Sequence, residues 1–151
     1  MSGRPLPEGR SRFDDILIGD WLQTGTTEIT ADMLDAFAEM TGDRFEIHMS
    51  DEAARAKGFA GRVAHGLLVL SLIDGLKNQS PAQFDAIASL GWDWRFSRPI
   101  LIGDMISARI EVIGKRVSHR AGRGTLTLDV SATNQIGEIV QEGINWLMVH
   151  R

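Results

Sequence analysis

An aspartate and a histidine five residues apart, Asp43 and His48, are the side chains of this sequence best suited to acid–base chemistry. A carboxylate and an imidazole on one wall of a site can share a water molecule, the carboxylate accepting its proton while the imidazole orients it or assists the transfer. Taken singly, an aspartate after a glycine more often shapes a turn, and a loop histidine is more often structural. The pair predicts a site only if neighbouring elements hold both side chains in place.

Helix signals on both sides of the pair indicate how it is held. Thr30 can cap a helix whose apolar face runs through residues 33–40, and Gly42 supplies a left-handed stop just before Asp43. A second, short helix begins at residues 50–52 and ends at Gly58. Asp43 therefore follows a helix end directly, and His48 lies in a tight connection between two helices.

A third helix, from Ala64 to Lys77, has apolar residues on nearly every face. A helix of this kind is typical of one that protein covers on all sides. Gly58, Gly61 and Gly66 precede or open it and allow a close approach of backbone to another group. This segment is expected to be the central helix of the fold.

After Pro81 the apolar period becomes two. Residues 92–97, 106–112 and 125–132 alternate apolar with polar side chains, and residues 138–149 become apolar on both sides, as in a more central strand. No helical pattern interrupts them, which favours an antiparallel sheet. One apolar sheet face and one helix that needs cover predict an α+β fold in which the sheet curls around the helix.

Several short motifs follow one another along the chain: Gly19-Asp20, Gly42-Asp43, His48, His65-Gly66, Trp94-Arg95-Phe96, and Pro99 followed by Gly103-Asp104. Their order resembles the MaoC-like, R-specific enoyl-CoA hydratase family over nearly the whole chain. One departure is that Phe45-Glu46 stand where that family usually has Asn-Pro. The resemblance implies a hot dog fold, an antiparallel β-sheet wrapped around a long central α-helix.

The resemblance also implies an activity, a hydratase or dehydratase (a carbon–oxygen lyase) acting on 2-enoyl-CoA or 3-hydroxyacyl-CoA thioesters. Asp43 and His48 would activate the water, and the backbone N–H of Gly66, which opens the central helix, would stabilise the enolate oxygen. The CoA thioester is the substrate, and no further cofactor is expected.

Three more residues are candidate substrate contacts. His65 is expected to tie the loop to the central helix, and Phe45 places an apolar ring where a polar contact is usual. Asp74 stands where related hydratases tend to have a small hydroxyl residue. Its alternative role is structural, an ion pair with Lys77 three residues on.

Composition restricts the function further. The 151 residues suit one domain, and a net charge of −4 argues against nucleic acid as the main partner. The absence of cysteine excludes disulfides and thiolate chemistry, and the four histidines show no metal-ligand spacing, so no metal site is predicted. The longest apolar run is too short to span a bilayer and no apolar leader is present, which favours a cytoplasmic protein without membrane contact.

Residues 1–12, rich in Gly, Pro and Arg, are expected to form a mobile arm, and residues 13–151 a single domain. The unpaired edge of a curved sheet predicts a homodimer or a dimer of dimers. Two other functions stay open, an acyl-CoA thioesterase of the same fold and a non-catalytic module that binds acyl-CoA or acyl-carrier protein.

Overall fold

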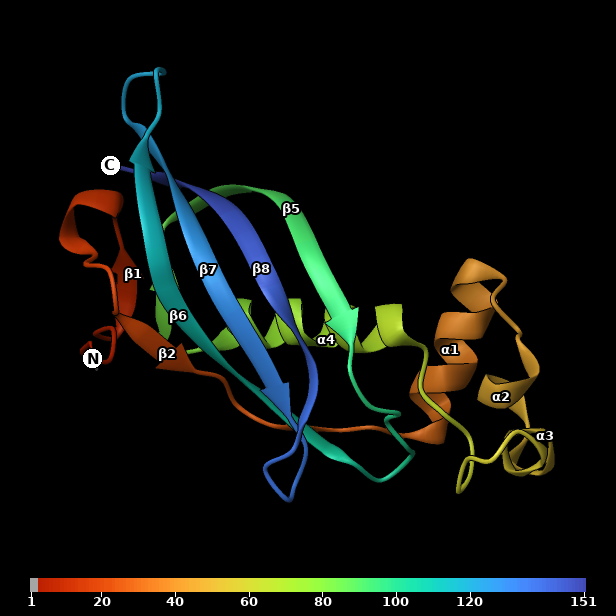
Figure 1. Cartoon of the computed structure of the whole chain (residues 1–151). Helices are drawn as coiled ribbons and strands as arrows, with labels where there is room; N and C mark the ends of the chain where they lie inside the picture. Colours follow the sequence, from red (N-terminus) through yellow and green to blue (C-terminus); the bar gives the residue numbers. More distant parts are fainter. Residues whose placement is uncertain (1–2) are drawn as a thin grey trace.

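An antiparallel sheet curves around one long helix in the computed structural model, which describes residues 3–151 (Figure 1). The strands of the sheet run in the order β2-β6-β7-β8-β5, and β3 pairs with β6 beside β2. Three helices, α1 to α3, gather beyond one end of the central helix α4. The helices are α1 Ala31–Thr41, α2 Glu46–Met49, α3 Asp51–Ala56 and α4 Gly66–Gln79, and the sheet strands are β2 Trp21–Gln23, β3 Thr27–Glu28, β5 Ala86–Phe96, β6 Met105–Val117, β7 Arg123–Thr133 and β8 Ile139–His150.

The predicted period-two pattern is confirmed in β7 and in residues 106–112 of β6, where every second residue is buried. In β7 the buried side chains are Leu126, Leu128, Val130 and Ala132, each 0% exposed. β6, β7, β8 and β5 pair antiparallel throughout, as the sequence predicts. The resulting core lies between the concave face of the sheet and one face of α4.

The expectation that α4 is covered on all sides is wrong for a single chain. Leu68, Val69 and Ile73 are buried against the sheet, but Leu67 on another face is 60% exposed. The helix also begins two residues later than predicted, at Gly66. The apolar residues on the exposed face are a surface that this chain does not itself cover.

Residues 3–12 do not extend away from the domain as an arm. β1 (Gly9–Ser11) pairs parallel with β4 (Ala82–Phe84), and Leu6 is 6% exposed. Arg4 reaches the buried carboxylate of Asp20 at 3.2 Å. The expected mobility concerned residues 1–12, of which the first two lie outside the described residues. The sequence gives no local sign of this docking because its partners lie far along the chain.

Within residues 3–151, none of the helices combines the length and the apolar character needed to cross a membrane.

Candidate active site

Asp43 is held by the end of α1. Thr30 caps the start of that helix through a hydrogen bond from the Met33 N–H to its Oγ1, and Gly42 ends it in the left-handed conformation with φ of +79°. Both features agree with the sequence prediction. Asp43 Oδ1 then accepts a hydrogen bond from the Phe45 N–H at 3.2 Å, so one carboxylate oxygen builds the turn. The residue is exposed, and its second oxygen is free to meet water.

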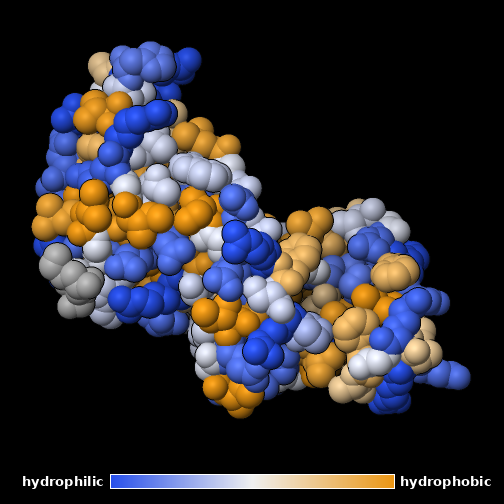
Figure 2. All heavy atoms as spheres, in the orientation of Figure 1, coloured by the Kyte–Doolittle hydropathy of each residue, from blue (hydrophilic) through white to orange (hydrophobic). Residues whose placement is uncertain are grey.

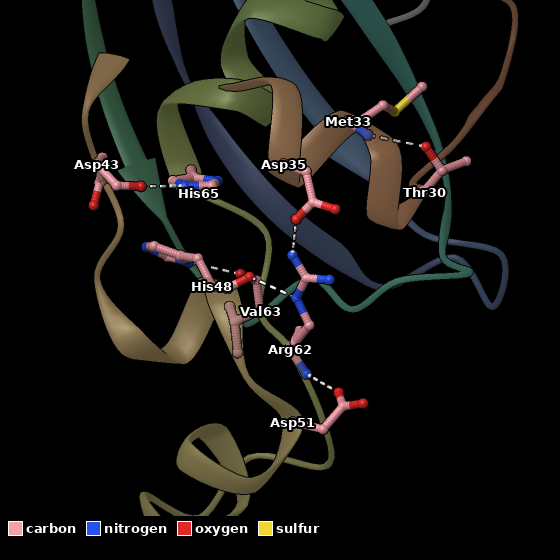
Figure 3. A network of polar contacts seen from close by, with 9 residues as sticks. All are labelled: Thr30, Met33, Asp35, Asp43, His48, Asp51, Arg62, Val63 and His65. Atoms are coloured by element: carbon pink, nitrogen blue, oxygen red, sulfur yellow. Dashed lines mark hydrogen bonds and ion pairs between the residues drawn. The ribbon is translucent and has the colours of Figure 1, made fainter. Parts of the chain in front are cut away.

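His48 lies in the single turn of α2, and its hydrogen bonding fixes its tautomer. Nδ1 is 2.6 Å from the carbonyl oxygen of Val63, which can only accept, so Nδ1 carries the proton. In neutral His48 the lone pair is then on Nε2. Figure 3 shows the imidazole pointing toward Asp43, so a proton acceptor faces the carboxylate.

His65 completes the cluster from the residue before α4. Its Nε2 is 2.9 Å from the backbone oxygen of Asp43, and its ring stacks on that of His48 with centroids 4.0 Å apart. One ring nitrogen of each histidine and one carboxylate oxygen of Asp43 all lie within 4.8 Å of one another. The expectation that His65 ties the loop to the central helix is therefore confirmed, and Figure 3 shows the three side chains together.

The environment of His65 favours its neutral form. Burial is the main cause of a lowered pKa, and the neighbouring His48 lowers it further, whereas the hydrogen bond to the Asp43 carbonyl opposes the shift. The Nδ1 atom is buried and, among the described residues, has no hydrogen-bond partner. A neutral His65 can stack on the His48 ring without adding a charge to the stack.

Three nitrogen and oxygen ligands so close together also raise the question of a metal ion, which the sequence did not predict. Lone pairs on imidazole nitrogens lie in the plane of the ring. The two rings are stacked at an interplanar angle of 27°, and each already uses one nitrogen on a backbone oxygen. This arrangement favours packing and proton handling over convergence of both rings on one ion.

Gly66 is the first residue of α4, and His65 is at its N-cap position. Among the described residues, no side chain accepts a capping hydrogen bond from the start of this helix. The first N–H groups of a helix lack intrahelical partners and carry the positive end of its dipole, so they suit a developing negative oxygen. An added Cβ at Gly66 would come within 2.5 Å of the Phe96 ring, so a side chain does not fit there without a shift.

A cavity of about 290 Å³ lies beside this cluster, and Asp43 and His65 are not among its lining residues. His48 and Gly66 both line it, together with apolar walls from the α2–α4 segment and from the connection between β5 and β6. The remaining lining residues are Ile47, Phe59, Val63, Ala64, Phe96, Ser97, Arg98, Pro99, Ile100 and Gln141. The space suits a small acyl group placed between an acid–base pair and a helix N-terminus.

Of the other predicted contacts, Phe45 lies beside the site and Asp74 does not. The Phe45 ring is 54% exposed and meets the His48 ring edge-on at 6.0 Å. Asp74 is eight residues along α4 from Gly66, about 12 Å at the usual helical rise. It pairs with the buried Lys77 at 2.9 Å, as its structural alternative predicted. Within one chain Asp74 is therefore separate from the acid–base pair.

Two residues of the site were missed from the sequence. Arg62 donates from Nε to the backbone oxygen of His48 at 2.7 Å and from Nη2 to Asp35 at 2.6 Å, while its own N–H bonds Asp51 (Figure 3). It thus ties α1, α2 and α3 together. A lone arginine in a glycine-rich turn carried no signal for this role.

Gln141 is the second. It is 1% exposed in β8, lines the cavity and bonds the carbonyl of Gly66 at 3.1 Å. In the sequence it stands between Val140 and Glu142, and this mixed pattern carried no signal for its burial.

A single curved sheet wrapped around one long helix, with the site at the N-terminus of that helix, defines a hot dog fold protein. A protein from Mycobacterium tuberculosis described as having a double hotdog fold superposes with a TM-score of 0.80 over 93% of this chain and 44% of its own, at 23% identity, which supports the fold alone. The MaoC-like dehydratase from Rhodospirillum rubrum superposes with a TM-score of 0.85 at 26% identity, over 93% of this chain and 97% of its own.

Residues 17–134 match the model of the MaoC like domain. The 3-hydroxybutyryl-CoA dehydratase of Methylorubrum extorquens is 32% identical over 142 residues, which is 91% of this chain and 84% of the relative. This chain therefore belongs to the MaoC-like dehydratase family. The β-methylmalyl-CoA dehydratase of Chloroflexus aurantiacus is 29% identical over 141 residues, 92% of this chain, but the chain spans only 40% of that longer relative.

Proposed function

We propose that this chain interconverts 2-enoyl-CoA and 3-hydroxyacyl-CoA thioesters by adding or removing water. The observation that carries the proposal is the approach of Asp43 and His48 within 4.8 Å, beside a cavity that also contains the uncapped start of α4 at Gly66. The similarity to a 3-hydroxybutyryl-CoA dehydratase supports the same reaction class.

Each group has a defined task in hydration. Asp43 accepts a proton from a water that His48 Nε2 orients, and the water oxygen bonds to Cβ of the thioester. The electrons of the double bond move onto the thioester as an enolate, whose oxygen the Gly66 N–H stabilises. A proton then adds to Cα, delivered from the protonated acid–base pair. Dehydration is the same sequence in reverse.

The site also has features of two other functions. A thioesterase would use the same helix N-terminus for the thioester oxygen but direct water to the carbonyl carbon. A binding module would hold the thioester and catalyse neither hydration nor hydrolysis. With crotonyl-CoA, hydration removes absorbance of the conjugated double bond without releasing a thiol. A thioesterase releases the thiol, and a binding module gives neither signal.

The dyad is tested by Asp43→Asn and His48→Gln. The Asn side-chain oxygen can still accept from the Phe45 N–H, so the turn survives while the base is lost. We expect kcat to fall by about 10²-fold or more in each variant, the usual contribution of general acid–base catalysis. Asp32→Asn serves as a matched control, because Asp32 is an exposed aspartate in the first turn of α1, the helix that ends just before Asp43. Wild-type turnover in both dyad variants would place the chemistry elsewhere.

A homodimer is part of this proposal. β5 is the edge of the described sheet, and apolar side chains near it and on α4 are exposed, with Leu67 at 60%, Leu90 at 52% and Phe96 at 57%. Figure 2 shows apolar residues gathered over the sheet and over the α1–α3 end of the molecule. A second copy would cover such surfaces. Sedimentation of the dilute protein as a well-folded monomer would refute this part.

A further inference from the structure

The amide of Gln141 is the buried polar group of the cavity that the proposed reaction does not use. It is 1% exposed and reaches the cavity from β8, beneath the start of α4. Most of the surrounding wall is apolar, including Val63, Ala64 and Ile100. A buried amide among apolar walls is unfavourable unless its hydrogen-bonding groups have partners.

The hydrogen bonds of Gln141 fix which way its amide faces. The indole N–H of Trp94 can only donate, and it lies 2.8 Å from Oε1 of Gln141. The carbonyl of Gly66 can only accept, and it lies 3.1 Å from Nε2. A flipped amide would lose both bonds at once, so the oxygen is held on the Trp94 side and the nitrogen on the α4 side.

One donor is then left over. The side-chain amide nitrogen carries two hydrogens, and the Gly66 carbonyl accepts one of them. Among residues 3–151, Gly66 is the one hydrogen-bond partner of this nitrogen. Because Gln141 lines the cavity, a bound acyl group can supply the acceptor that this second N–H lacks.

We propose that Gln141 selects thioesters whose short acyl chain carries an oxygen substituent, such as a hydroxyl or a carboxylate, beyond the double bond. The second N–H of Gln141 donates to that oxygen, while the first keeps the amide docked on α4. A cavity of about 290 Å³ suits a short chain of this kind. The inference rests on the proposed hydratase function and specifies its substrate class.

Trp94 has a separate part in the selection. Its indole N–H occupies the Gln141 oxygen, so the amide offers a free donor rather than a free acceptor. Trp94→Phe removes this bond and leaves the Gly66 carbonyl as the contact that orients the amide, whereas Gln141→Leu removes the amide altogether. The two variants therefore distinguish an oriented donor from a merely polar wall.

The test compares 4-hydroxybut-2-enoyl-CoA with pent-2-enoyl-CoA, which differ in a terminal hydroxyl against a methyl group, and adds fumaryl-CoA as the carboxylate. We expect wild-type kcat/KM to be at least tenfold higher for one of the oxygenated thioesters than for pent-2-enoyl-CoA. Gln141→Leu should abolish or reverse this ratio, and Trp94→Phe should reduce it. Each ratio is internal to one variant, so a general loss of stability does not change it.

Binding provides a readout without turnover. Calorimetry with saturated 4-hydroxybutyryl-CoA and pentanoyl-CoA should show the same tenfold preference in the wild type and its loss in Gln141→Leu. A binding preference without any hydration would refute the hydratase proposal and retain this one. Equal affinities, or a ratio that Gln141→Leu leaves unchanged, would refute the role of Gln141 even if every thioester is hydrated.

Discussion

Adding one methyl group at Gly66 tests the close approach of Phe96 to the start of α4. The Cβ of Gly66→Ala would lie 2.5 Å from ring carbons of Phe96, whereas carbon atoms in contact prefer about 3.5–4.0 Å. One of the two groups must therefore move by about 1 Å or more. Phe96 is 57% exposed and can yield, but the amide of residue 66 is the proposed donor to the enolate oxygen.

The expected magnitude combines opposing effects. Overpacking typically costs about 1–3 kcal/mol, and replacing a helical glycine by alanine regains up to about 1 kcal/mol. The net loss of zero to about 3 kcal/mol corresponds to a fall in Tm of up to about 12 °C for a domain of this size. If the amide is displaced, kcat falls by as much as about 10²–10³-fold, the effect of removing one oxyanion donor.

The assay is hydration of crotonyl-CoA together with thermal unfolding, for Gly66→Ala alone and combined with Phe96→Ala. Removing the ring should relieve the clash. Gly66→Ala should therefore lower Tm and kcat less when it is added to Phe96→Ala than when it is added to the wild type. A Gly66→Ala variant that gains the full helical benefit of about 1 kcal/mol would show that the methyl group meets no resistance, and would refute the close packing. A double variant that recovers nothing would show that the methyl group acts by another route.

Three further changes test neighbouring features. Arg62→Ala should lower the free energy of unfolding by about 1–3 kcal/mol, because it loses the charge-assisted hydrogen bonds to the His48 carbonyl and to α1. Arg62→Lys should recover only part of this loss, because lysine lacks the planar guanidinium. Denaturant unfolding measures both variants. Asp129 has a raised pKa, chiefly because of burial and then because of Glu111. Its ionised form is therefore unfavourable in the folded chain, and the folded chain loses stability as pH rises above the pKa that Asp129 has in the unfolded chain. Asp129→Asn should therefore raise the Tm at pH 7 and lose this advantage in acid, and an equal gain at all pH values would contradict the electrostatic cause. His65 has a lowered pKa, so the unfolded chain binds more protons than the folded chain as pH falls through about 6.5. The Tm of the wild type should therefore fall more steeply in this pH range than the Tm of His65→Asn.

Local signals were enough to predict much of the fold. The cap at Thr30 and the stop at Gly42 depend on neighbouring residues, and the alternation in β6 and β7 reports directly which side faces the core. These features act over a few residues, so the sequence contains their causes. The placement of Asp43 after a helix end followed from the same local logic.

Features that depend on distant partners could not be predicted in this way. Leu6 is buried through contacts remote in sequence, and the exposed face of α4 cannot be told from a covered one by composition. Arg62 and Gln141 act through backbone carbonyls on other elements, which leave no residue-specific mark in the sequence. The ion pair of Asp74 with Lys77 was foreseen because three residues separate them on one helix.

The turn at Asp43 restricts how this position can evolve. One carboxylate oxygen bonds the Phe45 N–H and shapes the loop, which leaves the other for the water. Asparagine would preserve the loop without the base, and glutamate would keep the charge on a side chain too long for the same turn. Every single substitution from aspartate therefore loses either the shape or the acidity. On the proposed mechanism, a relative with asparagine at this position would keep its fold and lose the hydration of the double bond, so this one position separates stability from activity.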